Sequence, residues 1–302
     1  MPKIIKYIGY PLLFIFSFFL FIYWTFPYSV LKDRIVGAVE QQLGSEYDVR
    51  IGDISPSFFT GVVLKQVKII KHDGDNTSTM LEAAKVRVRA SIGTLLFGGM
   101  NVKFSVKNQK SYFSGSFKNS DEGFSFAGNF DNFNLGDIGF ISGGGVKLSS
   151  AIDGDVKLNI NKRQMLQSTG SAELKLSNIA IKAGEVKLGE TAMPVPDIAL
   201  SKGSGSVLKM ELSKGTIKVT EFKLADGDLK LDLTGEMFMS TALKNYRMNL
   251  KGMFSVTPKL EQAMPFLFMI EKQKQADGSY PLTLTGRFGQ PSVKIGDFVL
   301  PI

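Results

Sequence analysis

Apolar and polar residues alternate with a period of two over most of the chain from Tyr47 onward. This pattern is typical of β-strands that bury one face and expose the other. The longest alternating run extends from Val146 to Ile160, and regular helical crossovers between successive runs are missing. Clean alternation favours antiparallel strands, and the missing helical crossovers exclude a parallel α/β architecture. The sequence therefore predicts a mainly β protein with a mostly antiparallel sheet.

Two segments outside these runs have a helical period instead. Leu31, Ile35 and Leu43 are spaced for one face of an amphipathic helix, which we expect over residues 29–44. This helix either lies along a bilayer surface or packs across the end of a sheet. Thr257 caps a second predicted helix, which Pro265 should kink or restart. We expect two or three short helices in all.

The first thirty residues have the composition of a membrane span. No charged residue occurs between Tyr7 and Val30, and a helix of about 20 apolar residues crosses the hydrocarbon core of a bilayer. A cleaved signal peptide is the alternative, but its apolar region is usually only about 7–15 residues long. Residues 1–28 are therefore expected to form a cytoplasmic tip and a transmembrane anchor. Residues 29–302 then form one β-rich domain.

Charge around this segment predicts its orientation. Lys3 and Lys6 precede it, whereas Lys32, Asp33 and Arg34 beyond it are mixed in sign. Because basic residues favour the cytoplasmic side, the N-terminus is expected in the cytoplasm and the bulk of the chain outside it. The protein should therefore be a single-pass membrane protein.

Composition excludes several kinds of chemistry. The chain has no cysteine and one histidine, His72, so thiolate chemistry and multi-histidine metal sites are ruled out. His72 lies in a polar segment without a marked nucleophile, and we predict neither enzyme activity nor a cofactor or metal. The formal net charge of +8 is modest and spread along 302 residues, which does not indicate nucleic-acid binding.

Phenylalanine is concentrated in the middle of the chain. These residues share the apolar parity of their strands, and Gly128 shares it too. A glycine on that face either lets the sheet bend sharply or lets a ligand approach the backbone. A sheet with so few helices must fold over itself, leave an apolar groove, or meet a partner. The predicted groove residues are Phe104, Phe113, Phe117, Phe124, Phe126, Gly128 and Phe130.

A second candidate site is basic. Lys85, Arg87 and Arg89 alternate with Ala84, Val86, Val88 and Ala90, so one face of this strand should be cationic and the other small and apolar. The cationic face is either simply solvated or contacts anionic headgroups or an acidic partner.

The two ends of the chain resemble one protein family. The N-terminal helix, the strand from Tyr47 to Ile51 and the run from Gly61 to Ile69 are similar to the opening of the type II secretion system protein N family. The segment from Asp277 to Pro291 looks like the one that closes many of those chains. Similar ends also occur in the wider AsmA-like group of envelope proteins.

This resemblance implies a location and two functions. It implies a bacterial inner-membrane protein with a periplasmic domain, acting as a non-enzymatic accessory component of the type II secretion machinery with other envelope proteins of that system as partners. AsmA-like relatives imply the alternative, a highly curved, half-barrel sheet whose apolar trough binds or transfers lipid. We carry both functions forward as hypotheses.

Overall fold

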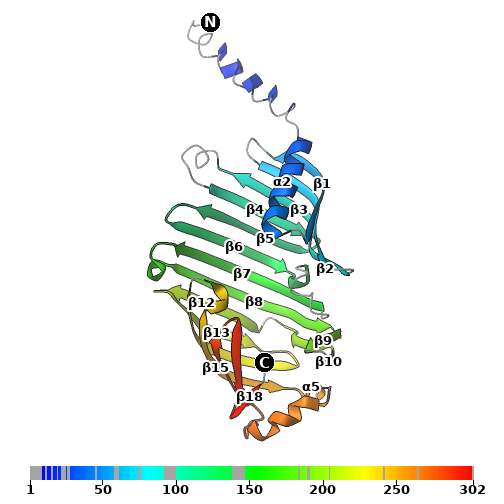
Figure 1. Cartoon of the computed structure of the whole chain (residues 1–302), viewed down its shortest axis with the longest axis vertical. Coiled ribbons are helices and arrows are strands. Elements are labelled where there is room, and N and C mark those ends of the chain that lie inside the picture. The colour runs from blue at the N-terminus through cyan, green and yellow to red at the C-terminus, as the bar shows by residue number, and fades with distance from the viewer. Residues whose placement is uncertain are drawn as a thin grey trace.

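The computed structural model describes residues 9–10, 12–14, 16–18, 20–21, 25, 28–44, 46–57, 61–73, 76–91, 100–137, 147–182, 184–188, 191–203, 205–240, 242–263 and 265–300. One large antiparallel sheet dominates this part of the chain, and its strands follow one another mostly in sequence order (Figure 1). The first strands are β1 (Tyr47–Ser57), β2 (Gly61–Asp73), β3 (Asn76–Ala90), β4 (Met100–Asn108), β5 (Ser111–Asn119), β6 (Gly123–Phe133), β7 (Lys147–Asn161) and β8 (Thr169–Lys182). The remaining strands are β9 (Gly184–Leu188), β10 (Thr191–Val195), β11 (Ile198–Ser201), β12 (Ser206–Ser213), β13 (Thr216–Leu224), β14 (Leu229–Phe238), β15 (Arg247–Val256), β16 (Tyr280–Arg287), β17 (Gln290–Ile295) and β18 (Phe298–Leu300).

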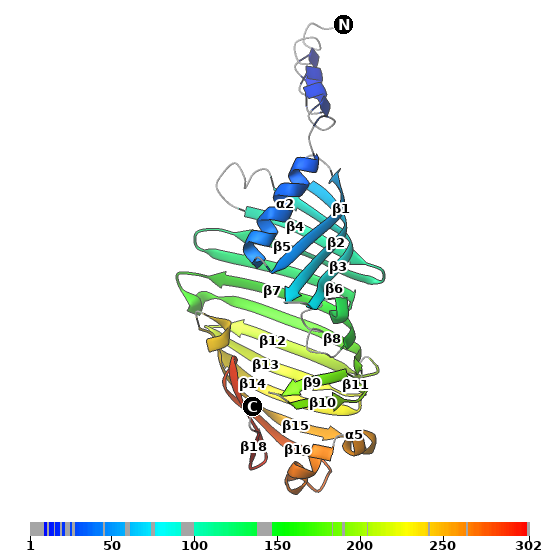
Figure 2. The ribbon, with the colours of Figure 1, turned by 45° about the vertical axis from the view of Figure 1, so that its right-hand side comes forward.

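The large sheet has 16 strands and is curled but not closed, because β1 and β18 stand at opposite ends of the strand order (Figure 2). Short helical elements lie beside it: α2 (Tyr28–Leu43), α5 (Pro258–Ala263), and the 3₁₀ segments η1 (Leu135–Asp137), η2 (Met165–Gln167), η3 (Leu243–Asn245) and η4 (Pro265–Gln273). The predictions of a mainly β, antiparallel architecture with few short helices are confirmed.

One excursion interrupts the sequence order between β8 and β12. Strand β11 pairs with the far end of β8, while β9 and β10 form a separate two-stranded sheet. The excursion returns next to β14, where the Ala199 amide donates to the carboxylate of Asp228 at 3.0 Å. Asp228 is almost fully buried, and this hydrogen bond satisfies one of its oxygens.

Helix α2 packs against the sheet at the N-terminal end, as one of the two sequence alternatives expects. Ile35, Val36 and Val39 contact a cluster that includes the buried residues Val49 and Ala83. A polar contact fixes the same position, because the Val49 amide donates to the Glu40 carboxylate at 2.9 Å. Burial against the sheet therefore explains the amphipathic spacing as far as Val39, whereas Leu43 in the last turn is exposed.

Helix α5 and segment η4 close the C-terminal end. The Leu260 amide points to the hydroxyl of Thr257 at 3.4 Å, in the predicted capping position. Helix α5 ends at Ala263 and η4 begins at Pro265, which confirms that proline restarts the helical segment. Leu267 and Ile270 of η4 are buried in a cluster with Tyr280 and Ile295.

Part of the predicted membrane anchor lies outside the described residues. Those of its residues that the structure describes between 9 and 25 are α-helical, and this helix stands away from the sheet (Figure 1). No helix within the described part of the chain is long and apolar enough to cross a membrane.

Candidate functional site

The two faces of the large sheet differ in chemistry. We call the face that carries α2 the apolar face and the opposite one the polar face. Side chains directly opposite one another on neighbouring strands point to the same face, so each face can be followed from strand to strand through the pairing register. We call each such series of directly paired residues a register line.

Three adjacent register lines on the apolar face contain only apolar residues and glycine. The first line is Val62, Val88, Phe104, Gly115, Gly128, Val156, Ala172, Met210, Val219, Gly235, Leu250, Leu284, Val293 and Leu300. The second is Leu64, Val86, Val106, Phe113, Phe130, Gly154, Leu174, Leu208, Phe222, Leu233, Gly252, Leu282, Ile295 and Phe298. The third is Ala90, Val102, Phe117, Phe126, Leu158, Gly170, Leu212, Ile217, Met237, Met248, Gly286 and Pro291.

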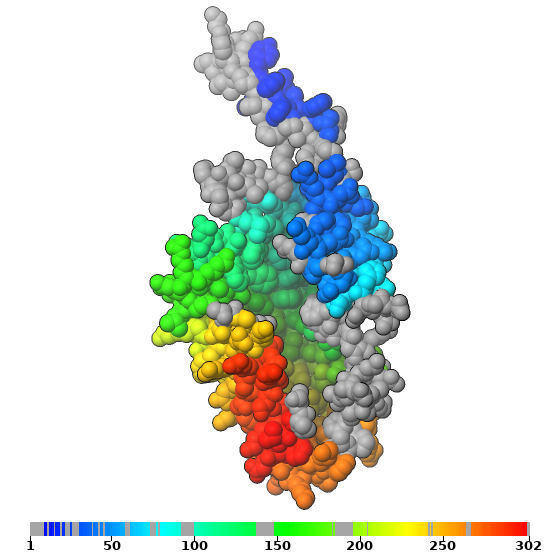
Figure 3. All heavy atoms as spheres, in the orientation of Figure 1, coloured from blue at the N-terminus to red at the C-terminus, as the bar shows by residue number. Residues whose placement is uncertain are grey.

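These lines run across the strands and form an apolar band from one end of the sheet to the other. Burial along the band is uneven. In the C-terminal half Val219, Leu233 and Leu250 are each less than a tenth exposed and pack in one cluster, while Met210, Phe222 and Leu284 beside them are half-buried. Over β4 to β6 the phenylalanines are only half-buried. In the space-filling view the face that carries α2 is hollowed over these middle strands (Figure 3).

The structure brings all seven predicted groove residues together on the apolar face of β4, β5 and β6. Phe113 lies at the centre of the group. Its ring centroid is 4.6 Å from that of Phe130, 5.3 Å from Phe104 and 6.5 Å from Phe126. Phe117 and Phe124 form a separate pair at 5.9 Å. Phe133, which the sequence reasoning did not single out, also contacts Phe113 at 5.8 Å.

Gly128 leaves no vacant notch in this face. A Cβ placed on Gly128 would lie 3.0 Å from the Phe126 ring and 3.1 Å from the Phe113 ring. The neighbouring Gly115 is covered in the same way by Phe104, whose ring would be 2.8 Å from such a Cβ. Aromatic rings therefore lie over both glycines, an arrangement that is known to support glycine positions in sheets. The groove surface here is made by phenyl rings, not by exposed backbone.

Other glycines of the band serve curvature. Gly154 has a φ of +138° and Gly235 a φ of +144°, values that side-chain-bearing residues rarely adopt. At both positions a Cβ would collide with a carbonyl oxygen of the next strand, Glu173 beside Gly154 and Asn249 beside Gly235. Of the two interpretations offered by the sequence, sharp bending with close strand approach describes these two positions.

The predicted basic residues lie on the polar face of β3. Arg87 and Arg89 are exposed and Lys85 is half-buried. Lys85 stands opposite Lys65 on β2 and Lys107 on β4, and Arg89 stands opposite Lys103. The cationic face thus extends over three strands, further than the single-strand alternation indicated.

The apolar side of the same strand differs from the prediction at one residue. Val86 and Val88 face the apolar side, but Ala84 is exposed and Ala83 is completely buried. The change occurs opposite Gln66, whose φ of +52° is unusual for a residue other than glycine. The alternation of side chains between the two faces is interrupted at this point, so the buried positions of β3 shift by one residue.

His72 lies at the end of β2, not in a loop. Its Nε2 is 4.0 Å from a carboxylate oxygen of Asp48, and its Nδ1 is 3.5 Å from the Thr77 hydroxyl. About half of its side chain is exposed to solvent. Among the described residues there is no group of three or more potential metal ligands.

A coupled polar group lies at the C-terminal end of the domain. The Lys274 ammonium donates to the Glu261 carboxylate at 2.9 Å, and this hydrogen bond holds the pKa of Glu261 below its usual value. The hydroxyl of the fully buried Tyr280 points to the same carboxylate at 3.4 Å, and burial raises the pKa of that hydroxyl. These contacts tie α5 to β16.

Comparison of the chain with protein-family models, with curated proteins and with solved structures gives no match. The functional argument therefore depends on the geometry described above.

Proposed function

We propose that this protein is a non-enzymatic, membrane-anchored lipid-binding protein that holds acyl chains on the apolar face of its curled, AsmA-like sheet. The observation that carries the proposal is the unbroken apolar band, in which three register lines cross the sheet without a single polar residue. A flexible hydrocarbon chain needs a continuous apolar path and few polar groups, which this band provides.

The half-buried phenylalanines mark where a chain would bind. Soluble monomers rarely expose contiguous apolar patches of more than a few hundred Å² unless the patch binds something. The aromatic group centred on Phe113 contributes rings from three strands to one surface, and the hollow over these strands leaves room for a ligand (Figure 3). Helix α2 and segment η4 lie at the two ends of the sheet (Figure 1).

The energetics favour retention of a chain over this surface. Transfer of one methylene from water to an apolar site contributes about 0.8 kcal/mol, so ten methylenes contribute about 8 kcal/mol before the cost of ordering the chain. Phenylalanine rings add little conformational cost of their own, because those around Phe113 already pack on one another.

The N-terminal segment supports anchoring in a membrane. The side chains of Leu12, Phe14, Phe16 and Phe21 are each at least three-fifths exposed, which is unfavourable in water and favourable in a bilayer. We place the N-terminus in the cytoplasm and the β domain in the bacterial periplasm, because Lys3 and Lys6 precede the segment. The protein would then be a single-pass protein of the inner membrane.

Native mass spectrometry of the full chain, released from nonionic detergent after extraction from membranes, tests the lipid site. We expect a mass shift that corresponds to bound phospholipid. Phe126→Asp should abolish it, because a carboxylate would then lie beside the rings of Phe104 and Phe113. Ser125→Asp is the matched control, since Ser125 is the neighbouring residue on the polar face and hydrogen-bonds to Asn159 there. Absence of lipid from the wild type, or equal loss in both variants, would contradict the proposal.

A second candidate function is that of an accessory component of the type II secretion machinery. It is favoured by the resemblance of the two chain ends, which correspond to α2, β1 and β2 at one end and to the β16–β17 hairpin at the other. Affinity purification from native membranes should then recover other envelope proteins of that system. If they are absent and secretion continues in a deletion strain, this candidate fails while the lipid site stays open to its own test.

A further inference from the structure

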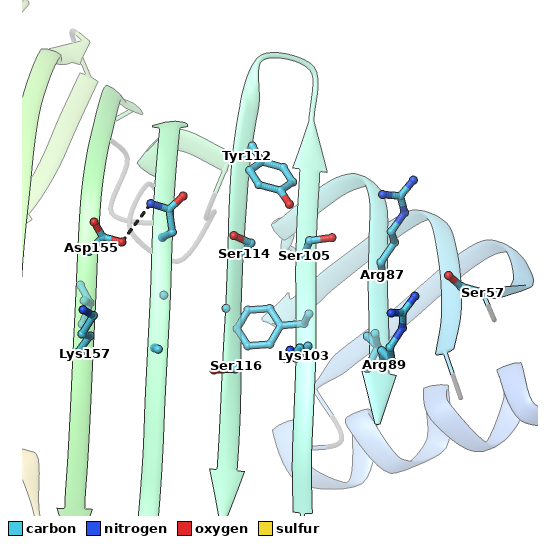
Figure 4. A pocket seen from close by; sticks show the side chains of 17 residues that line it. Ser57, Arg87, Arg89, Lys103, Ser105, Tyr112, Ser114, Ser116, Asp155 and Lys157 are labelled. Atoms are coloured by element: carbon cyan, nitrogen blue, oxygen red, sulfur yellow. Dashed lines mark hydrogen bonds between the residues drawn. The ribbon is translucent and has the colours of Figure 1, made fainter. Parts of the chain in front are cut away.

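The polar face has a depression of its own over β3 to β7. It has a volume of about 420 Å³ and lies on the opposite side of the sheet from the apolar band. In Figure 4 the side chains of Arg87 and Arg89 line one side of it, those of Asp155 and Lys157 line the other, and Ser105, Ser114 and Ser116 lie between them. Tyr112 stands at one end (Figure 4).

The depression exists because short side chains are flanked by long ones. In one register line Arg87 is followed by Ser105, Ser114, Asn129 and Asp155. In the next line Arg89 and Lys103 are followed by Ser116, Ala127 and Lys157. Since strands are about 4.8 Å apart, the two sides of the depression, β3 and β7, are separated by about 19 Å. The result is a shallow groove with a hydroxyl-bearing floor.

A second depression of about 500 Å³ continues the groove. It shares Arg87, Ser105 and Tyr112 with the first and adds Lys85, Lys107 and Lys110. Together the two depressions are lined by seven cationic side chains, namely those of Lys85, Arg87, Arg89, Lys103, Lys107, Lys110 and Lys157, and by the carboxylates of Asp131 and Asp155.

Several of these cations face one another across neighbouring strands. Arg89 stands directly opposite Lys103, and Lys85 directly opposite Lys107, although like charges facing each other across strands are destabilising. At another place on the polar face opposite charges pair, as in Lys209 with Glu221 at 2.9 Å, although Arg247 also stands directly opposite Arg287. Arg87, Lys103 and Lys157 form no ion pair within the described residues. An external anion would relieve this repulsion.

We propose that this groove binds an acidic saccharide, a sugar chain that carries carboxylate or phosphate groups. Arg87, Arg89 and Lys103 bind the anionic groups, since guanidinium and ammonium groups match carboxylate and phosphate oxygens. The serine hydroxyls of the floor donate to and accept from sugar hydroxyls, and the exposed ring of Tyr112 offers an apolar surface to a sugar face. The site is on the other face from the acyl-chain band and does not depend on it.

Isothermal titration calorimetry of the full chain in nonionic detergent tests this site with three probes. These are hexagalacturonate, the uncharged maltohexaose, and vesicles of phosphatidylglycerol. We expect hexagalacturonate to bind and maltohexaose to bind at least tenfold more weakly. The double variant Arg87→Gln, Lys103→Gln should weaken hexagalacturonate binding at least tenfold. Its matched control is Lys218→Gln, Lys251→Gln, which removes the same charge from the polar face of β13 and β15 and should change the dissociation constant less than twofold.

A variant of the groove floor distinguishes a ligand that binds inside the groove from a flat membrane surface that contacts only the charged side chains. Ser114→Leu fills the floor without changing charge, so it should weaken hexagalacturonate binding at least fivefold. No binding of hexagalacturonate, or equal weakening by the two charge variants, would overturn the proposal. Vesicle binding that depends on Arg87 and Lys103 but tolerates Ser114→Leu would overturn it too, in favour of a membrane contact. If thermal melting shows that the double variant is unfolded, Lys103→Gln alone should still weaken binding at least threefold.

Discussion

The aromatic group on β4 to β6 makes a quantitative prediction about stability. Phe113 and Phe117 lie on the same strand and are both half-buried on the apolar face. Phe113 contacts four other rings, those of Phe104, Phe126, Phe130 and Phe133, whereas Phe117 contacts one described ring, that of Phe124. Replacing each of these two residues by alanine therefore compares the loss of stability caused by losing many ring contacts with the loss caused by losing few, at similar burial.

The expected difference follows from these contacts. Truncation of a fully buried phenylalanine costs about 3–5 kcal/mol, so a half-buried one should cost about 2 kcal/mol. Each aromatic pair adds about 0.5 kcal/mol at the lower limit of measured values. Phe113 has three pairs more than Phe117, so Phe113→Ala should lower the free energy of unfolding by about 1.5 kcal/mol more than Phe117→Ala does.

Urea unfolding of the two variants, followed by far-ultraviolet circular dichroism in the same detergent, measures this difference. Both variants must be stripped of lipid first, because a bound ligand stabilises the folded state and would obscure the comparison. Phe113→Leu is the control, since it retains most of the apolar volume and loses only the ring contacts. Equal losses for Phe113→Ala and Phe117→Ala would refute the reasoning, because they would mean that the rings do not stabilise one another.

Two further predictions concern backbone and charge. Gly235→Ala should lower the free energy of unfolding by at least about 2 kcal/mol and so lower the thermal midpoint, because its φ is +144° and the new Cβ would meet the Asn249 carbonyl. Nothing lies near a new Cβ at Gly37 in helix α2. Gly37→Ala should therefore raise the free energy of unfolding by about 0.5–1 kcal/mol and raise the midpoint. The hydrogen bond from Lys274 lowers the pKa of Glu261, so its stabilising effect is present above the unfolded pKa of about 4.3 and is lost as pH falls through the lower folded value. The thermal midpoints of the wild type and Glu261→Gln should therefore differ at pH 6, and the difference should shrink as the pH falls below about 4. A difference that stays constant with pH would contradict this assignment.

The sequence was most informative where local chemistry decides the structure. Thr257 and Pro265 predict the capped helix α5 and its restart, and both are observed. The spacing of apolar residues likewise predicts α2. Alternation identifies the antiparallel strands, because the two-residue period depends only on the strand itself.

The sequence was less informative where strands act on one another. The interruption of the alternation at Gln66 moves the buried position from Ala84 to Ala83, and a positive φ at glutamine has no clear signal in composition. The covering of Gly128 by Phe113 and Phe126 depends on cross-strand register, which alternation does not specify.

The groove on the polar face could not be predicted from the sequence for a related reason. Ser114 and Ser116 alternate with phenylalanines that dominate the pattern of β5, and their significance appears only beside the long side chains of β3 and β7. Ser105 and Ser114 stand directly opposite each other on β4 and β5, but Ser116 stands opposite Lys103.

The register lines have an implication for how such a molecule changes size. Each line takes one residue from every strand that it crosses, so the width of the apolar band depends on the number of lines. Its length depends on the number of neighbouring strands. Inserting one more hairpin of the same alternation would extend the hydrocarbon path by about 9–10 Å and leave its cross-section untouched. The length of the apolar band can therefore change by duplication of hairpins, and its width can change by lengthening of the strands. In a protein built this way the two dimensions vary independently.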